Sequence, residues 1–383
     1  MHVNDLLKIA IDSGASDLHC KVGSMPMMRV RGTLIPASEE KRLDHDDMVA
    51  MAAAVIPTAH REKFKERHEM DLAYSVVGLG RFRCNAFQQR GTIGMIFRVI
   101  PFGVPSVDEL ALPPVLKRIA AEERGLLLVT GTTGSGKSTT LAALVDEINA
   151  MRAAHVMTIE DPIEYLHRDR RSIINQREIG VDTDSFAQAL RSALRQDPDV
   201  ILVGEMRDFE TIQTALLAAE TGHLVLSTLH TLDATETINR VVAVFPPHQQ
   251  KQVRLQLASV LRAVLSQRLL PRRDSQGRVP AVEVMITTPY IRDCIIDKEK
   301  THLIHTAIAQ GTSQYGMQTF DQSIFSLLEQ GLVSYDEALR WASNVDEFKL
   351  RVQGIATTAD LAREKMSRDT NLAGLSNITR FGE

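Results

Sequence analysis

The sequence of 383 residues contains only three cysteines and no long apolar segment. Cys20, Cys84 and Cys294 lie far apart and form no Cys-x-x-Cys pair, so we expect neither a disulfide framework nor a zinc knuckle. Reduced thiols in a cytoplasmic protein are the simpler interpretation. No apolar run approaches the ~18 residues that a membrane span needs. Asp5 and Lys8 give the N-terminus an amphipathic pattern unlike a signal peptide. We therefore expect a cytoplasmic protein with no transmembrane segment, which leaves peripheral docking on a membrane complex open.

The sequence also lacks a dominant charge of one sign. It has 44 basic and 48 acidic residues and a formal net charge of -4, which gives no global reason to expect nucleic acid or an anionic membrane as partner. Hydrophobic residues make up 44% and charged residues 24%, as in an ordinary soluble globular protein. The length suits two or three domains, at ~150 residues per domain.

The first hundred residues predict a small α+β domain, 1–101. A helix is expected at Leu6–Ile11 and a longer helical stretch at Asp46–Arg67. Alternating or β-branched segments predict five strands, at Asp17–Cys20, Met28–Val30, Asp71–Val77, Arg81–Gln88 and Gly94–Ile100. Prolines and a glycine then mark a linker, 102–113.

From residue 114 to 288 the pattern changes to apolar runs that alternate with helical segments. Four runs predict buried strands, at Leu126–Thr130, Val156–Ile159, Val200–Val203 and Leu224–Thr228. Such alternation is typical of an α/β core with a mainly parallel sheet. The segment 289–353 predicts a helical region, and we expect the tail, 354–383, to be mobile because its apolar periodicity fades.

A glycine-rich loop stands between the first of these strands and a helix. Its sequence GTTGSGKST fits the Walker A pattern. Glycines let backbone N–H groups turn inward around phosphates, and the helix N-terminus adds positive potential. Lys137 is expected to reach the β- and γ-phosphates of ATP, and the Ser138 hydroxyl to join the Mg²⁺ shell. The predicted nucleotide-binding residues of the loop are Gly131, Thr132, Thr133, Gly134, Ser135, Gly136, Lys137, Ser138 and Thr139.

Acidic residues follow two other strands of the predicted sheet. Glu205 ends the apolar strand Val200–Val203, as a Walker B acid does, and would act on Mg²⁺; the alternative is a surface acid paired with Arg207. Glu160, Asp161 and Glu164 follow the strand at Val156–Ile159. Glu164 is our candidate for polarising the attacking water, with Glu160 and Asp161 holding the loop or the metal shell. The alternative is that these acids only solvate a turn.

Histidines and arginines complete the candidate site. His223 and His230 flank the strand at Leu224–Thr228, and His230 is expected to sense the γ-phosphate by hydrogen bonding, although a histidine near a strand end is more often structural. The first domain carries Arg81, Arg83, Arg90 and Arg98. They are either solvated strand charges or groups that reach the nucleotide of a neighbouring subunit.

Taken in order, these motifs resemble those of the type II/IV secretion superfamily of hexameric ATPases, and in particular the PilT/PilU-type pilus retraction ATPases. The resemblance covers about residues 1 to 350. The strings that carry it are the Walker A loop, Thr158–Tyr165, Val203–Asp208, Thr221–Thr231, Gly14–His19, Gly80–Arg83, Asn175–Glu178 and Gly316–Asp321.

The resemblance implies a PAS-like N-terminal domain, a RecA-like P-loop ATPase core and a C-terminal helical region. It implies a homo-hexamer that binds ATP with Mg²⁺ between the two domains, with contributions from the adjacent protomer. Hydrolysis would turn an inner-membrane platform protein and disassemble the pilus, with the ring docked peripherally on that membrane. By position, Glu164 matches the family's catalytic glutamate, Glu205 its Walker B acid, and His223 and His230 its His-box residues.

Alternative functions differ in the machine that the ATPase drives. Pilus assembly and type II secretion relatives carry a longer N-terminus and a tetracysteine zinc site, which three isolated cysteines cannot form. Tyr290–Asp297 keeps Arg292 of the family's AIRNLIRE-like motif but not its Asn or second Arg, so an accessory retraction ATPase, partnered with a paralogue, is a second reading. A RecA-like nucleic-acid motor is disfavoured by the net acidity and by the lack of a basic-aromatic stretch for binding a strand. A non-hydrolysing scaffold is disfavoured by the retained Lys137, Ser138, Glu164 and Glu205.

Overall fold

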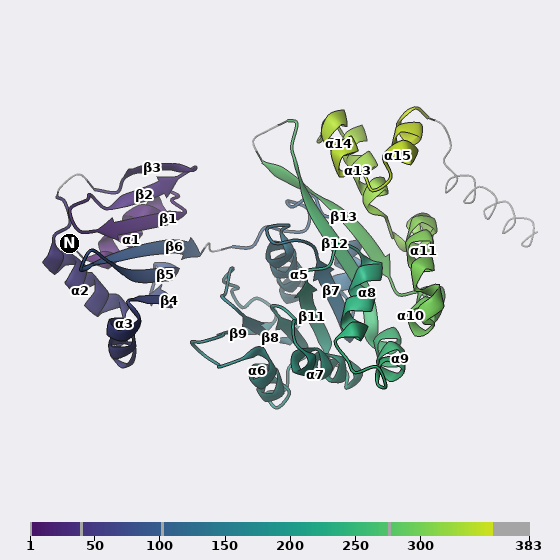
Figure 1. Ribbon diagram of the computed structural model, residues 1–383, viewed down its shortest axis with the longest axis horizontal. Helices are drawn as coiled ribbons and strands as arrows, with labels where there is room; N and C mark the ends of the chain where they lie inside the picture. Colours follow the sequence, from purple (N-terminus) through teal and green to yellow (C-terminus); the bar gives the residue numbers. More distant parts are fainter. Residues whose placement is uncertain (1, 39–40, 101–102, 275–276, 355–383) are drawn as a thin grey trace, which may run out of the picture. The chain divides into compact units, whose positions relative to one another are not determined.

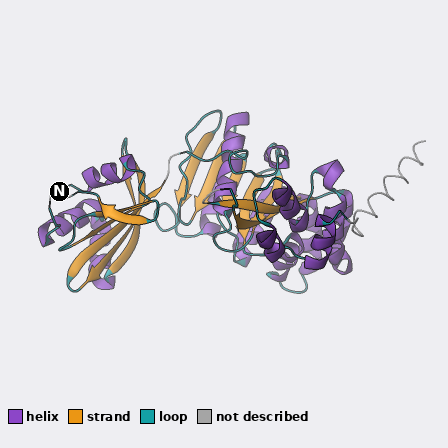
Figure 2. Ribbon diagram, turned by 90° about the horizontal axis from the view of Figure 1, so that it is seen from above, coloured by secondary structure: helices purple, strands orange, loops and turns teal. Residues whose placement is uncertain are grey.

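The computed structural model describes residues 2–38, 41–100, 103–274 and 277–354. It divides into two compact units, Met1–Val104 with Ile163–His167, and Pro105–Pro162 with Arg168 onward. The expected α/β class, with an α+β first unit, is confirmed (Figures 1 and 2). The sequence-based boundaries at 101, 114 and 289 stay predictions, and the expected mobile tail lies outside the described residues from 355 on.

The first unit is a six-stranded antiparallel sheet with helices on one face. Its strand order is β3-β2-β1-β6-β5-β4. The core consists of α1 and α2 side chains, among them Leu6, Leu7, Met48 and Met51, packed on inward-facing residues of the strands such as Phe82. The strands are β1 Asp17–Lys21, β2 Met27–Val30, β3 Thr33–Pro36, β4 Glu69–Val76, β5 Gly80–Gln89 and β6 Thr92–Ile100, and the helices are α1 Val3–Asp12, α2 His45–Val55 and α3 Arg61–Arg67.

Two expectations for this unit need correction. The helical stretch predicted at Asp46–Arg67 is not one helix, because α2 ends before Pro57 and a short 3₁₀ turn, Thr58–His60, precedes α3. Proline cannot continue a helix and restricts the residue before it, which explains the break. The edge strand β3 was not predicted, since its four exposed residues show no apolar alternation.

The second unit is built on a seven-stranded sheet of order β13-β12-β7-β11-β10-β8-β9. The strands β12, β7, β11, β10, β8 and β9 pair in parallel, and only β13 is antiparallel to its neighbour. The strands are β7 Gly125–Thr130, β8 His155–Glu160, β9 Ile173–Glu178, β10 Val200–Val203, β11 Leu224–Leu229, β12 Leu261–Pro271 and β13 Arg278–Ile286. The four buried strands expected from apolar runs are confirmed as β7, β8, β10 and β11.

Helices connect and cover this sheet. They are α4 Val115–Ala120, α5 Lys137–Met151, α6 Phe186–Ala193, α7 Phe209–Glu220, α8 Ala234–Ala243 and α9 Gln250–Val260, followed by α10 Pro289–Ile296, α11 Ile304–Gln310, α12 Thr312–Tyr315, α13 Phe320–Glu329, α14 Tyr335–Trp341 and α15 Val345–Val352. A separate apolar cluster joins α13–α15 to the β12–β13 pair through residues such as Leu270, Val279, Phe320 and Phe348. Helices α13–α15 therefore pack on β12, the neighbour of β7, and on the edge strand β13. None of the helices in the described ranges has both the length and the apolar character that a membrane span needs.

Candidate active site

The glycine-rich loop connects β7 to α5, as the sequence predicts. Strand β7 is buried at every position, and α5 begins at Lys137 directly after Gly136. Gly131, Gly134 and Gly136 have φ values of 140°, 80° and 91°. L-residues with a side chain rarely adopt such values, so the loop depends on these glycines to turn its backbone. The chain thus places the glycine-rich loop at the carboxyl edge of a parallel sheet, where ligands of such sheets bind.

The loop has the features that fit a bound phosphate. Lys137 is 8% exposed, and its Nζ donates to the carbonyl oxygens of Gly131 and Thr132, each at 2.9 Å. The Ser135 hydroxyl is buried and has no hydrogen-bond partner among the described residues. Ser138 is exposed at the first turn of α5, where the helix N-terminus supplies positive potential. The charged amine and the free hydroxyl suit an anionic oxygen-rich ligand.

Other predicted residues meet the loop at the same edge. Because β7, β11, β10 and β8 run parallel, the residues after each strand lie along one edge: Gly131, His230, Glu205 and Asp161. Glu205 Oε2 lies 2.8 Å from Arg207 Nη2 and 3.7 Å from His230 Nε2. The ion pair with Arg207, given above as the alternative for Glu205, is therefore present, but Arg207 is 68% exposed and such pairs contribute little. The Glu205 side chain is itself 26% exposed, so its carboxylate stays accessible beside this ion pair.

The three acids at the end of β8 and just after it differ in their surroundings. Glu160 Oε1 accepts hydrogen bonds from Thr158 Oγ1 at 2.7 Å and from Gln176 Nε2 at 3.1 Å, which ties this carboxylate to β8 and β9. Asp161 and Glu164 are exposed. Glu164 belongs to the segment Ile163–His167, which groups with the first unit. Glu160 is thus held in place by the fold, whereas Glu164 presents a solvent-accessible carboxylate.

His223 lies at the other end of β11 from His230. Its carbonyl oxygen accepts from the Gly125 N–H at the start of β7, and its Nδ1 lies 2.9 Å from the carbonyl oxygen of Ala218. Within its own unit it is therefore on the amino edge of the sheet, opposite the glycine-rich loop. The structure does not bring His223 together with His230. The nucleotide contact predicted for His223 therefore cannot be made at the edge that carries the glycine-rich loop of the same chain.

Arg83 and Arg98 of the first unit share the sheet face that no helix covers. Arg83 on β5 is in register with Arg98 on β6, and Arg98 Nε lies 3.0 Å from Asp17 Oδ1. Burial opposes ionisation of Asp17, but hydrogen bonds from Ser16 and Arg98 outweigh it and hold the pKa of Asp17 below its ordinary value. Arg83 Nε lies 3.8 Å from Asp71 Oδ1. The Arg83 and Arg98 side chains are 46% and 69% exposed, and both stay accessible to a further partner.

Arg81 and Arg90 occupy different places in the same unit. Arg81, next to Gly80 at the start of β5, donates from Nη1 to Ser75 Oγ at 3.4 Å. Arg90 stands in the tight turn between β5 and β6 with a φ of 49°. Arg81 therefore shares the face of Arg83, and Arg90 does not belong to the row of strand arginines.

Sequence reasoning missed a polar cluster beneath the loop. Thr130 Oγ1 donates to Ser266 Oγ at 3.0 Å, and Thr140 Oγ1 donates to Gln267 Oε1 at 2.8 Å. All four side chains are buried. The signal was available, because Ser266 and Gln267, followed by Arg268, interrupt the apolar residues Ala263–Leu265 and Leu269–Leu270. Polar side chains that are buried in such a strand need hydrogen-bond partners, so their presence indicates a polar neighbour.

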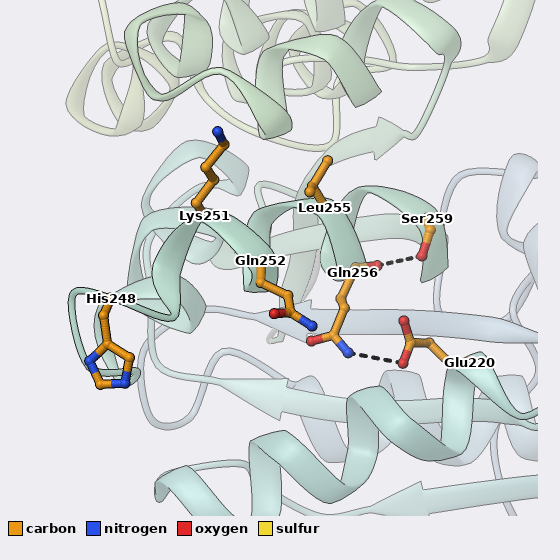
Figure 3. Close-up of a pocket in the computed structure, with 7 residues that line it drawn as sticks. All are labelled: Glu220, His248, Lys251, Gln252, Leu255, Gln256 and Ser259. Atoms are coloured by element: carbon orange, nitrogen blue, oxygen red, sulfur yellow. Dashed lines mark hydrogen bonds between the residues drawn. The ribbon is translucent and has the colours of Figure 1, made fainter.

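A pocket between α7 and α9 lies apart from these residues (Figure 3). Gln256 Nε2 donates to Glu220 Oε2 across it at 3.0 Å, and His248, Lys251 and Leu255 also line it. None of the predicted site residues contributes to its lining. The candidate active site is therefore an exposed edge of the sheet and not this pocket.

The comparisons with known proteins agree with this geometry. The type II/IV secretion system protein family matches residues 109–340. The chain belongs to this family. It is 46% identical over 348 residues to the type IV pilus retraction ATPase PilT of Pseudomonas aeruginosa, an alignment that covers 91% of this chain and 100% of PilT. It is 40% identical to the type IV pilus ATPase PilU of the same organism, with 94% of each chain covered.

Two solved structures of this family share its fold. The crystal structure of the pilus retraction motor PilT with bound ADP matches with a TM-score of 0.83 at 44% identity, over 91% of this chain and 98% of PilT. The ATPase DotB of Legionella pneumophila matches with a TM-score of 0.74 at 28% identity, over 92% and 95%. The predicted resemblance to PilT/PilU-type retraction ATPases is confirmed, and the chain is a nucleotide-binding ATPase of this family.

The loop after His230 is anchored by a buried carboxyl group. Glu283 on β13 is 2% exposed, and its Oε1 accepts from the N–H of Ala234, the first residue of α8, at 2.9 Å. Burial raises the pKa of Glu283 to about 7; the Ala234 N–H and Arg268 oppose the rise, and Asp233 and Asp321 add to it. A proton on Glu283 is thus bound more tightly in the folded than in the unfolded chain.

This shift makes the free energy of unfolding depend on pH. Between the ordinary value of 4.5 and about 7 the folded chain binds more protons than the unfolded chain, so stability is lost as pH rises through this window. Glu283→Gln keeps an acceptor for Ala234 and removes the charge. We expect it to raise the free energy of unfolding by about 3 kcal/mol at pH 8 and to change it little at pH 4.5. Urea unfolding at the two pH values measures this, with the exposed Glu329→Gln as control; an equal effect of Glu283→Gln at both values would contradict the assignment.

Proposed function

We propose that this chain is an ATP-hydrolysing motor that drives the retraction of type IV pili. The observation that carries the proposal is the placement of the Lys137 loop and Glu205 at one edge of the sheet, in a chain that aligns with PilT over the whole length of PilT. The chain has a formal net charge of -4 and no excess of basic residues, which gives no support to a nucleic-acid motor.

The residues divide the work of the site. Lys137 and the N–H groups of the glycine-rich loop would hold the phosphates of ATP. Ser138 and Glu205 would hold Mg²⁺, which neutralises charge on the phosphate oxygens when bound. Glu164 would accept the proton of the attacking water, while Glu160 and Asp161 fix the loop that carries it. His230, within 3.7 Å of Glu205, would report on the γ-phosphate by hydrogen bonding.

Assembly completes the site in this proposal. Arg81, Arg83 and Arg98 lie on the uncovered sheet face of the first unit and would reach the nucleotide of the adjacent protomer in a homo-hexamer. His223, on the amino edge of its own sheet, would act at such a protomer boundary and not at its own loop. Hydrolysis should then depend on assembly, and a fully active isolated monomer in sizing experiments would rule the shared site out.

The motor would dock peripherally on the inner-membrane pilus platform protein. Deletion of the gene, scored for surface pili and twitching, tests the function. Piliated cells that do not twitch are expected, because pili would still be assembled but not withdrawn. Bald cells would show instead that the chain serves pilus assembly or secretion.

An accessory role beside a paralogous retraction ATPase is a second candidate. It is favoured by the 40% identity to PilU across 94% of each chain. It is also favoured by the altered segment Tyr290–Asp297, in which Arg292 donates from Nε to the carbonyl oxygen of Ala258 at the end of α9. The retained arginine thus has a structural partner, whereas the positions that differ are free to change the docking surface. An accessory motor would leave twitching dependent on the paralogue's own hydrolysis.

A further inference from the structure

Strand β12 runs past the end of β7 and continues beside the glycine-rich loop. Thr130, the last residue of β7, is in register with Ser266. The next residue of β12, Gln267, therefore lies beside Gly131, the first residue of the loop. Gln267 is 3% exposed, and nothing in the proposed chemistry uses it.

Gln267 contacts both ends of the loop. A Cβ atom added to Gly131 would lie 2.4 Å from the Gln267 carbonyl oxygen, and one added to Gly136 would lie 2.9 Å from Gln267 Nε2. A Cβ at Gly134, in the middle of the loop, would meet nothing within 4 Å. The first glycine of the loop thus packs against the Gln267 backbone and the last against the Gln267 side chain, while the middle of the loop is open.

Gln267 also holds the helix that follows. Thr140 Oγ1 donates to Gln267 Oε1 at 2.8 Å, and both side chains are buried. Thr140 is three residues after Lys137 and so lies on a neighbouring part of the same helical face. A hydrogen bond in a buried setting is directional and costly to leave unmade. The bond therefore fixes the first turn of α5 relative to β12.

We propose that Gln267 is a positioning residue of the nucleotide site. By contacting Gly131, Gly136 and Thr140 together, it holds the loop and the first turn of α5 in the shape that presents Lys137 and Ser138 to phosphates. This inference rests on the nucleotide site of the proposed function and not on pilus retraction. Its test is binding by the purified chain, so a chain that binds ADP but retracts no pili would sink the proposed function alone.

Three variants of the full-length chain separate positioning from stability. Gln267→Met keeps the size of the side chain and removes the acceptor; Thr140→Val keeps the shape and removes the donor; the third variant combines both. We expect each single variant to weaken the binding of ADP with Mg²⁺ by about tenfold, the size of one lost buried hydrogen bond, and to lower the melting temperature of the free chain.

The double variant decides between the two roles. It leaves no buried polar atom of this pair unpaired, so its melting temperature should return toward that of the parent chain. Its affinity for ADP should stay about tenfold lower, because the restraint on the first turn of α5 is still missing. The matched control is Gln318→Met, which removes a 2.7 Å hydrogen bond to the Val282 carbonyl oxygen on β13, away from the loop. It should lower the melting temperature without changing ADP affinity.

Two results would overturn the proposal. One is an unchanged affinity for ADP in Gln267→Met. The other is recovery of affinity together with melting temperature in the double variant, which would make the bond purely structural. Should Gln267→Met fail to fold, Thr140→Val carries the same comparison, since it retains the glutamine, and an unchanged affinity in that variant would equally refute the assignment.

Discussion

Replacing Lys137 by alanine should lower ATP hydrolysis by at least about 100-fold. The Lys137 amine is 8% exposed and donates to two carbonyl oxygens of its own loop, at 2.9 Å each. It is therefore held where the phosphates of a nucleotide would lie, with its charge only weakly screened by water. Alanine removes that charge and both hydrogen bonds, so nucleotide binding should weaken as well. Phosphate release and equilibrium binding of ATP measure the two effects.

A matched control separates this loss from a general effect of removing a lysine. Lys251 on α9 is exposed and lines the pocket between α7 and α9, away from the glycine-rich loop. Lys251→Ala should hydrolyse ATP as the parent chain does. Unchanged kinetics in Lys137→Ala, or an equal loss in both variants, would contradict the assigned role. Circular dichroism of each variant shows whether the fold is retained.

The buried strands of the nucleotide-binding core could be predicted because each has a strong local signal. Leu126–Val129 and Val200–Val203 are uninterrupted apolar runs, and both lie in buried strands of the structure. The glycine-rich loop has a specific spacing, which needs little tertiary information. Motif order then made the family recognisable.

Features that depend on tertiary pairing could not be predicted as well. Strand β9 carries the polar residues Asn175, Gln176 and Arg177, so its composition does not predict a strand. It forms one because its backbone pairs with β8. His223 precedes β11 and His230 follows it, so the two histidines lie at opposite edges of the sheet. Their closeness in sequence suggests the contrary. Of the two hydrogen bonds that Glu160 accepts, the one from Gln176 joins β9 to β8, whereas the one from Thr158 lies within β8. Spacing alone therefore could not distinguish the acids after β8.

That distinction leads to the second large effect, which we expect from Glu164→Gln. Glutamine keeps the size of the Glu164 side chain but cannot accept a proton from water. A positioned general base contributes about 10²–10⁴-fold to a rate, so steady-state hydrolysis should fall by about 100-fold or more. ATP binding should be retained, because Glu164 is not part of the phosphate loop. Rapid filtration with labelled ATP, beside phosphate release, measures binding and turnover separately.

Glu160→Gln is the matched control for this prediction, since Glu160 ends β8 and Glu164 follows it by four positions. The Glu160 carboxylate already accepts hydrogen bonds from Thr158 and Gln176. Its replacement should therefore lower the melting temperature, because each weakened hydrogen bond costs about 1 kcal/mol of stability. Turnover should change only a few-fold. Near-normal hydrolysis by Glu164→Gln would sink its assignment. If Glu160→Gln lost turnover instead, the proton acceptor would be the carboxylate held between β8 and β9, and the exposed Glu164 would only solvate its turn.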